Sequence, residues 1–160
     1  MGIRWVALLC LVGGCAADAD PHAGPAWLEV GGGEMRFEPL ADGAEMTLAA
    51  GAQGGWHLWL AVHAGGMRPG AAELRVRMEP EGWEGPLQER WWQVPLEAVP
   101  GEAFCEHVGA AAVLSPAECL VDRPLRLDVT VSSGDGRSAT DTVVVVPRAP
   151  ATAEMPPCME

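Results

Sequence analysis

Residues 125–146 read LRLDVTVSSGDGRSATDTVVVV, and this stretch decides the fold class. Apolar residues occupy every second position from Leu125 to Val131, and polar residues fill the positions between them. Such alternation is typical of a β-strand with one buried face. Residues 133–136, Ser-Gly-Asp-Gly, have the composition of a tight turn, and the valine-rich residues 138–146 can return beside the first strand. The stretch therefore predicts an antiparallel hairpin.

Further short strands are predicted on the N-terminal side of this hairpin. Residues 73–79 alternate apolar and charged side chains, as a half-buried strand does. Residues 56–63 form another strand, with a core face of Trp56, Leu58, Leu60 and Val62 and an outer face of His57, Trp59, Ala61 and His63. Weaker strand patterns occur at residues 34–40, where Met35 and Phe37 would share a face, at 46–48, and at 91–96, where Pro95 favours an edge position. Residues 80–89 predict a loop, and residues 102–114 predict a short helix or an irregular stretch.

About seven short strands with turn signals between them predict an all-β sandwich over residues 27–147. The hairpin at 125–146, with its Gly-Asp-Gly turn and valine-rich last strand, resembles the end of many immunoglobulin-like or fibronectin-like bacterial domains. This resemblance implies an immunoglobulin-like β-sandwich. The sequence departs from immunoglobulin domains because it lacks their cysteine pair around a core tryptophan. Residues 148–160 are rich in proline and alanine and predict a disordered tail.

The formal charge of the 160-residue chain is −12, and its acidic residues are scattered among apolar ones. This distribution is typical of a solvated acidic surface. Nucleic-acid binding requires clustered basic residues. The closest basic pair, Arg75 and Arg77, is flanked by Glu73 and Glu79. We therefore expect no nucleic-acid partner.

The first fifteen residues, MGIRWVALLCLVGGC, have the organisation of a bacterial export signal. Arg4 gives a positive start, and residues 5–12 form an apolar run shorter than the roughly 20 residues that span a bilayer. The run ends in Leu-Val-Gly-Gly-Cys at residues 11–15, which resembles the lipobox of bacterial lipoproteins. This resemblance implies that residues 1–14 are removed as a signal peptide and that Cys15 becomes the lipid-modified first residue.

Two alternatives remain for the N-terminal segment. Residues 17–19, Ala-Asp-Ala, also suit an ordinary signal peptidase, which would remove Cys15, and the apolar run could stay as an uncleaved anchor. In the lipoprotein interpretation, residues 15–26 are a flexible tether between the lipid and the domain. Ala16 after the cysteine goes with sorting to the outer membrane in Gram-negative families. The predicted location is therefore the cell envelope, with a lipid anchor in the outer membrane.

Three cysteines besides Cys15 would remain in the mature chain. Cys105 and Cys119 lie in the region without a clear strand pattern, and a disulfide between them would close a loop of roughly 15 residues. An oxidising envelope favours this disulfide, and two unpaired thiols are the alternative. Cys158 is left over, either free or available for pairing between molecules. A zinc site is not predicted, because the sequence has no C-x-x-C.

The candidate surface patch consists of His57, Trp59 and His63, which follow a glycine cluster at residues 51–55. Six positions separate the two histidines, about 20 Å in an extended strand. Ligands of one metal ion lie within about 4 Å of each other, so these histidines do not form a metal site on an unbroken strand. Exposed aromatic residues near loops favour a contact with another molecule. The alternative is that this face is partly buried under the loop at residues 80–89.

The run at residues 51–60 is similar to a segment in lipoproteins of GC-rich Gram-negative bacteria such as myxobacteria, and this resemblance implies no activity. The sequence contains no G-x-S-x-G motif, and it predicts no metal and no cofactor. We expect a non-enzymatic, membrane-anchored envelope lipoprotein with a binding or structural role toward another envelope protein or a glycan. The alternative is a small periplasmic metal-binding or enzymatic module that uses His57, His63 or His107.

Overall fold

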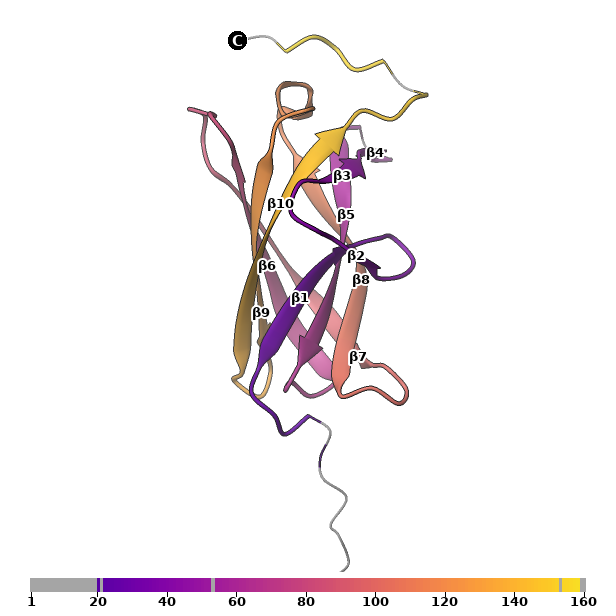
Figure 1. Cartoon of the computed structure of the whole chain (residues 1–160), viewed down its shortest axis with the longest axis vertical. Coiled ribbons are helices and arrows are strands. Elements are labelled where there is room, and N and C mark those ends of the chain that lie inside the picture. Colours follow the sequence, from indigo (N-terminus) through magenta and orange to yellow (C-terminus); the bar gives the residue numbers. More distant parts are fainter. Residues whose placement is uncertain (1–19, 21, 53, 153, 159–160) are drawn as a thin grey trace, which may run out of the picture.

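The structure is a computed structural model that describes residues 20, 22–52, 54–152 and 154–158. Within these residues the chain forms ten strands and one 3₁₀ turn, η1 (Ala117–Cys119), and no α-helix (Figure 1). The strands are β1 (Trp27–Gly32), β2 (Glu38–Pro39), β3 (Ala44–Thr47), β4 (Ala49–Ala50), β5 (Trp56–Gly65), β6 (Gly70–Pro80), β7 (Gln88–Ala98), β8 (Phe104–Leu114), β9 (Leu125–Ser133) and β10 (Ser138–Arg148). The predicted all-β fold is confirmed, with more strands than the seven or so that we expected.

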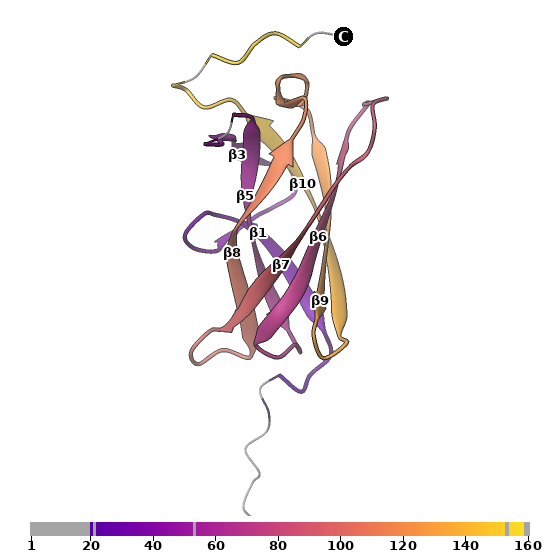
Figure 2. The same cartoon turned by 180° about the vertical axis from the view of Figure 1, so that it is seen from behind.

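The ten strands form one strongly curled sheet in the order β2-β1-β5-β8-β7-β6-β9-β10-β3, with β4 paired to β5 (Figures 1 and 2). The two ends of the sheet approach each other, because Asp141 of β10 accepts a hydrogen bond of 3.0 Å from the amide of Val30 in β1. The two walls join through β7, which pairs with β6 along most of its length but with β8 only at Glu97 and Ala98. Curling thus produces a sandwich with a single core between the walls.

The hairpin predicted at residues 125–146 is present as β9 and β10. Its register places Leu127 opposite Val143, and the amide of Ser133 donates a 2.9 Å hydrogen bond to the carbonyl of Arg137 across the turn. Leu127 and its apolar partners along β9 are fully buried. Full burial of such a side chain stabilises the fold by about 1.5–3 kcal/mol. This hairpin forms one wall of the core together with β6.

The strand predicted at residues 56–63 is β5, and it is covered on both faces. Leu58, Leu60 and Val62 lie fully buried in the core, as the alternation predicts. The other face is not open to solvent, because Ala61 is also fully buried and His57 is only 7% exposed. On that face, Phe37 from the β1–β2 loop and Phe104 of β8 pack against His63, and Trp59 packs against His57.

The expected helix or irregular stretch at residues 102–114 is wrong, because this segment is β8. A β-bulge explains why the alternation was not visible: Leu60 pairs with Ala110 but Val62 pairs with His107, so two residues of β8 oppose one of β5. Gly109, with φ of +77°, occupies the bulge. The extra residue of a bulge changes which of the alternating side chains face the core. On the N-terminal side of the bulge the odd-numbered Cys105 points inward, whereas on its C-terminal side the even-numbered residues point inward.

The expected strand at residues 34–40 is reduced to β2, and residues 33–37 form a loop. Met35 is 84% exposed, whereas Phe37 folds back over Gly31. A Cβ on Gly31 would lie 2.5 Å from the Phe37 ring, so only glycine fits beneath it. Met35 and Phe37 therefore do not share a face.

Pro95 lies inside β7, which is longer than the strand expected at residues 91–96. Its carbonyl points away from β6 and accepts a 3.2 Å hydrogen bond from Nδ1 of His107 on β8. The N–H and C=O of one strand residue point to the same side in an antiparallel ladder. The missing amide of Pro95 thus falls on the side where β7 has few ladder bonds.

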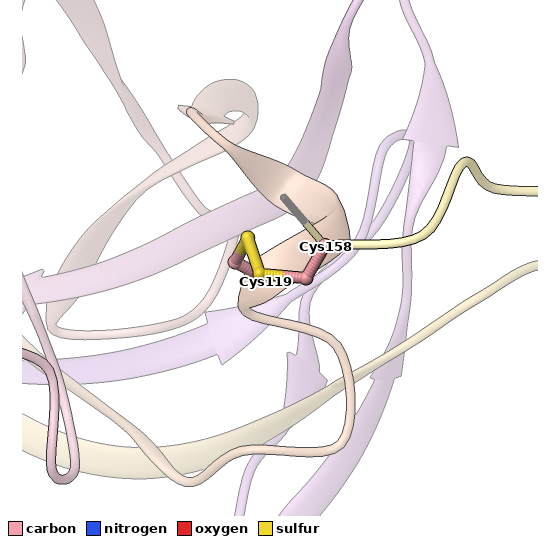
Figure 3. The surroundings of a disulfide bond; sticks show 2 residues. All are labelled: Cys119 and Cys158. Carbon is pink, nitrogen blue, oxygen red and sulfur yellow. A yellow bond between two sulfur atoms is a disulfide. The ribbon is translucent and has the colours of Figure 1, made fainter. Parts of the chain in front are cut away.

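The expected Cys105–Cys119 disulfide is wrong, because Cys119 pairs with Cys158 (Figure 3). Cys105 stands at the start of β8 and Cys119 follows its end, so the extended strand separates them by roughly 30 Å. A disulfide needs Cα atoms within about 7 Å. The bond to Cys158 ties the C-terminal segment, expected to be disordered, across one end of the sandwich, where Met155 packs against the core.

Candidate functional site

The candidate patch on β5 does not exist as one exposed surface. His57 is buried, its ring lies edge-on to Trp59 at a centroid distance of 4.4 Å, and its Nε2 has no hydrogen-bond partner among the described residues. Trp59 is half-buried and lines a hollow between β2 and β3. The two side chains mainly cover each other, which leaves little surface for a partner.

His63, the third member of the predicted patch, is held on four sides. Its ring stacks on Phe37 at 3.6 Å and packs against Phe104 at 4.3 Å. Its Nδ1 lies 3.3 Å from a carboxylate oxygen of Glu29, and its Nε2 lies 3.2 Å from one of Glu106. These glutamates are the direct neighbours of His63 on β1 and β8. Both ring nitrogens are engaged, so His63 cross-links three strands rather than presenting a free ligand.

The histidines of the metal-binding alternative do not meet. His107 donates to the Pro95 carbonyl, and burial lowers the pKa of His107 below its ordinary value. His57 and His63 lie in the separate surroundings described above. Among residues 20, 22–52, 54–152 and 154–158, no group of three His, Cys, Asp or Glu side chains is arranged to hold a metal ion.

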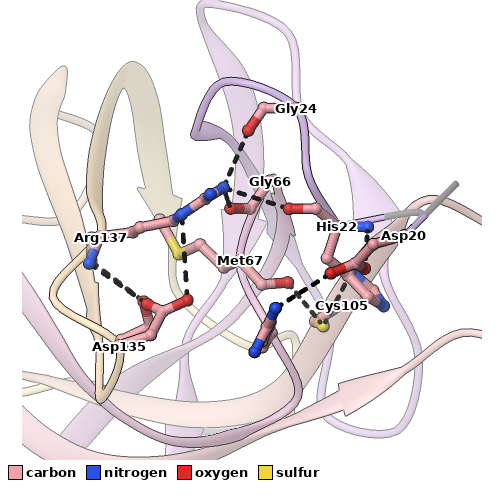
Figure 4. Close-up of polar contacts among 10 residues, drawn as sticks. Asp20, His22, Gly24, Gly66, Met67, Cys105, Asp135 and Arg137 are labelled. Atoms are coloured by element: carbon pink, nitrogen blue, oxygen red, sulfur yellow. Dashed lines mark hydrogen bonds and ion pairs between the residues drawn. The ribbon is translucent and has the colours of Figure 1, made fainter.

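A second polar cluster lies at the end of the sandwich where the chain enters β1, and sequence analysis missed it (Figure 4). Arg137, from the β9–β10 turn, donates through Nη1 to the carbonyls of His22 at 3.1 Å and Gly24 at 2.9 Å, and to the carbonyl of Gly66. Arg68 forms an ion pair with Asp20 at 3.2 Å. The two arginines hold the residues that precede β1, which were expected to belong to a flexible tether.

Cys105 lies beneath this cluster as a buried free thiol. Its Sγ is 3.5 Å from the carbonyl oxygen of Met67, to which it donates, and 3.9 Å from Nδ1 of His22. Burial raises the pKa of the Cys105 thiol. Because the thiolate is the nucleophilic form, the contact with His22 does not make Cys105 a reactive cysteine.

The opposite end of the sandwich carries two neighbouring hollows, which we call the Trp83 hollows. One has a volume of about 500 Å³ and the other about 440 Å³, and Trp83 in the β6–β7 loop lines both. The indole Nε1 of Trp83 is buried without a hydrogen-bond partner among the described residues. The larger hollow is lined by Glu79, Pro80, Glu81, Gly82, Trp83, Glu84, Pro124, Arg126 and Val144, and the smaller one includes Arg123 and both cysteines of the disulfide.

The charge at the larger Trp83 hollow is mostly negative. Glu79, Glu81 and Glu84 are exposed around it. Glu79 lies 3.9 Å from the guanidinium of Arg77, and Arg126 is paired with Asp128 at 2.9 Å. An aromatic wall with carboxylates at the rim suits a positively charged group. A tryptophan within the Pro/Gly/Glu-rich stretch 80–89 was the sequence signal for this site.

No protein-family model matches the chain, and no curated protein matches it at a significant level. No helix in the described ranges has the length and hydropathy needed to cross a bilayer. The candidate site is therefore assigned from its own geometry.

Proposed function

We propose that the chain is a lipid-anchored envelope protein whose β-sandwich binds another envelope protein through the Trp83 hollows. The lipobox ending at Cys15, five positions before the first described residue, is the observation that carries the anchor. Lipid attachment there would leave the sandwich on the membrane surface, where its role is to contact other molecules.

The binding part of the proposal rests on the contrast between the two ends of the sandwich. The end near Asp20 is braced by internal hydrogen bonds of Arg137 and carries a smaller hollow of about 340 Å³ beside Arg68 and Asp135. The other end combines a half-buried tryptophan, exposed carboxylates and open volume, which are features of interaction sites. The glutamates favour a partner that presents lysine or arginine side chains.

Two measurements test this function. The intact mass of the protein purified from bacterial membranes should show a lipidated N-terminus at Cys15, and Cys15→Ser should release the protein from the membrane. An unmodified N-terminus at Asp20 would contradict the anchor.

Co-purification from solubilised membranes tests the binding site. A specific partner should be recovered with the wild type and be lost with Glu81→Arg combined with Glu84→Arg. The matched control is Glu97→Arg combined with Glu102→Arg, the same double charge reversal at exposed positions of the opposite end. Equal recovery with both reversals would contradict binding at the Trp83 hollows.

A further inference from the structure

The residues that lead into β1 are bound to the sandwich and form what we call the stem, Asp20 and residues 22–26. One guanidinium, that of Arg137, serves three carbonyls, two from the stem and one from the β5–β6 turn (Figure 4). Hydrogen bonds from a charged donor are about twice as strong as those between neutral groups. Arg137 therefore joins the stem to two turns of the sandwich at once.

Gly66 shows that the stem is packed as well as hydrogen-bonded. Its φ is +65°, and a Cβ at this position would lie 2.3 Å from the carbonyl oxygen of Pro25. A real Cβ does not approach backbone so closely, so the stem rests directly on the β5–β6 turn. The ion pair between Asp20 and Arg68 holds the first described residue to the same turn.

The β9–β10 turn is built to present Arg137. The hydroxyl of Ser133 donates to Asp135, and Asp135 accepts the amide of Arg137 at 3.2 Å. The Ser133 hydroxyl holds the pKa of the Asp135 carboxyl below its usual range, so Asp135 is a carboxylate beside the guanidinium. The carboxylate and the turn orient Arg137 toward the stem.

We propose that the bound stem orients the lipidated protein, so that the β5–β6, β7–β8 and β9–β10 turns face the lipid surface and the Trp83 hollows point away from it. This inference rests on the proposed lipid anchor at Cys15. Five residue steps separate Cys15 from Asp20, and a fully extended chain spans at most about 17 Å over them. The end of the sandwich that carries the stem must then stay within that distance of the anchor.

Three further features favour an upright orientation over one in which the sandwich lies flat. An 11-residue strand such as β6 extends about 36 Å. The β6–β7 loop, which carries Trp83, therefore lies at the other end of the sandwich from the stem (Figures 1 and 2). The formal charge of −12 over the chain disfavours contact of a large face with an anionic membrane. Trp27 lies at the stem end, where its ring centroid is 5.9 Å from that of Phe104, and it is 41% exposed. An exposed tryptophan suits a membrane–water interface.

Fluorescence transfer to labelled lipids tests the orientation in the full lipidated protein. The chain contains no lysine, so Glu102→Lys on the β7–β8 loop and Glu84→Lys on the β6–β7 loop each introduce one side-chain amine for a dye. The proteins are reconstituted in vesicles of phosphatidylethanolamine and phosphatidylglycerol that carry a headgroup acceptor. We expect several-fold greater quenching of the dye at position 102 than at position 84.

The variant Arg137→Gln should bring the two quenching values together, and it should speed hydrogen exchange of the Ala23 amide, which donates to the Asp20 carbonyl within the stem. The control Arg75→Gln changes an exposed arginine of β6, away from the stem and from the Trp83 hollows, and should leave the asymmetry intact. Equal quenching at both positions in the wild-type background would overturn the proposal, as would full asymmetry in Arg137→Gln.

Vesicle flotation separates this inference from the proposed function. A wild-type protein that fails to float with the vesicles would contradict the lipid anchor itself. A protein that floats but shows no asymmetry would contradict only the orienting role of the stem.

Discussion

Removal of the Cys119–Cys158 disulfide tests the way the C-terminal segment is held. The two cysteines are 39 residues apart. In the chain-entropy model, a cross-link over that separation stabilises the folded state by about 4 kcal/mol. Cys158→Ser should remove this contribution and also release Met155 from the core, where it is partly buried.

Urea unfolding followed by tryptophan fluorescence measures the effect, in a Cys15→Ser background that carries no lipid. For an m value of about 2 kcal/mol/M, the midpoint should fall by about 2 M. The Cys15→Ser protein with no other change should show the same fall in its midpoint in reducing buffer, because reduction breaks the same bond. The matched control is Cys105→Ser, since a serine hydroxyl can still donate to the Met67 carbonyl. This control should shift the midpoint much less.

The alternative pairing makes the opposite prediction. A Cys105–Cys119 bond would contribute about 3 kcal/mol, so Cys105→Ser would then lower the midpoint strongly and Cys158→Ser would not change it. That result would refute the described topology of β8, which places the two cysteines near its opposite ends.

Three further predictions concern the core, the free thiol and acid stability. Leu60→Ala should lower the free energy of unfolding by about 2–5 kcal/mol in the same urea assay, because Leu60 is fully buried; a change below 1 kcal/mol would contradict the burial of Leu60 in the core. Cys105 should react with iodoacetamide at pH 7 only after unfolding, because burial raises its pKa; rapid labelling of the native protein would be inconsistent with this. Burial raises the pKa of the Asp128 carboxyl, but hydrogen bonds from Thr142 and Arg126 outweigh it and leave the pKa below its ordinary value. A carboxyl with a lowered pKa stabilises the fold above about pH 4, and this stabilisation is lost as the pH falls through the folded-state pKa. Asp128→Asn should therefore destabilise the protein at pH 7, and the difference in unfolding free energy between variant and wild type should shrink below pH 4. A difference that stays constant with pH would contradict the lowered pKa of Asp128.

Much of the fold was predictable because it depends on local periodicity. Alternation of period two identified β5, β6 and β9 and the core face of each, since side chains alternate across any strand, and the turn signal before the valine-rich residues predicted β10 as the partner of β9. The same rule failed at β8, because the bulge at Gly109 reverses parity within the strand. It also failed to show that β5 has two covered faces, because coverage of the outer face depends on residues from other strands.

The candidate sites were less predictable because each one is built from segments distant in sequence. His63 meets Glu29 and Glu106 only through the register of β1, β5 and β8. Arg137 reaches the stem across more than a hundred residues, and its sequence context shows only a turn. Spacing along the chain also suggested the wrong disulfide, because it carries no information on the extended strand that separates Cys105 from Cys119.

The sequence by itself determined that the chain is an acidic all-β protein with a C-terminal hairpin, and it predicts an N-terminal lipobox. These properties follow from composition, alternation and a contiguous motif, which are local. Only the tertiary structure decided which cysteines pair, what covers His57 and His63, and how the stem is held by Arg137. Those contacts depend on strand register and on the curl of the sheet, because both bring together side chains that no short stretch of sequence contains.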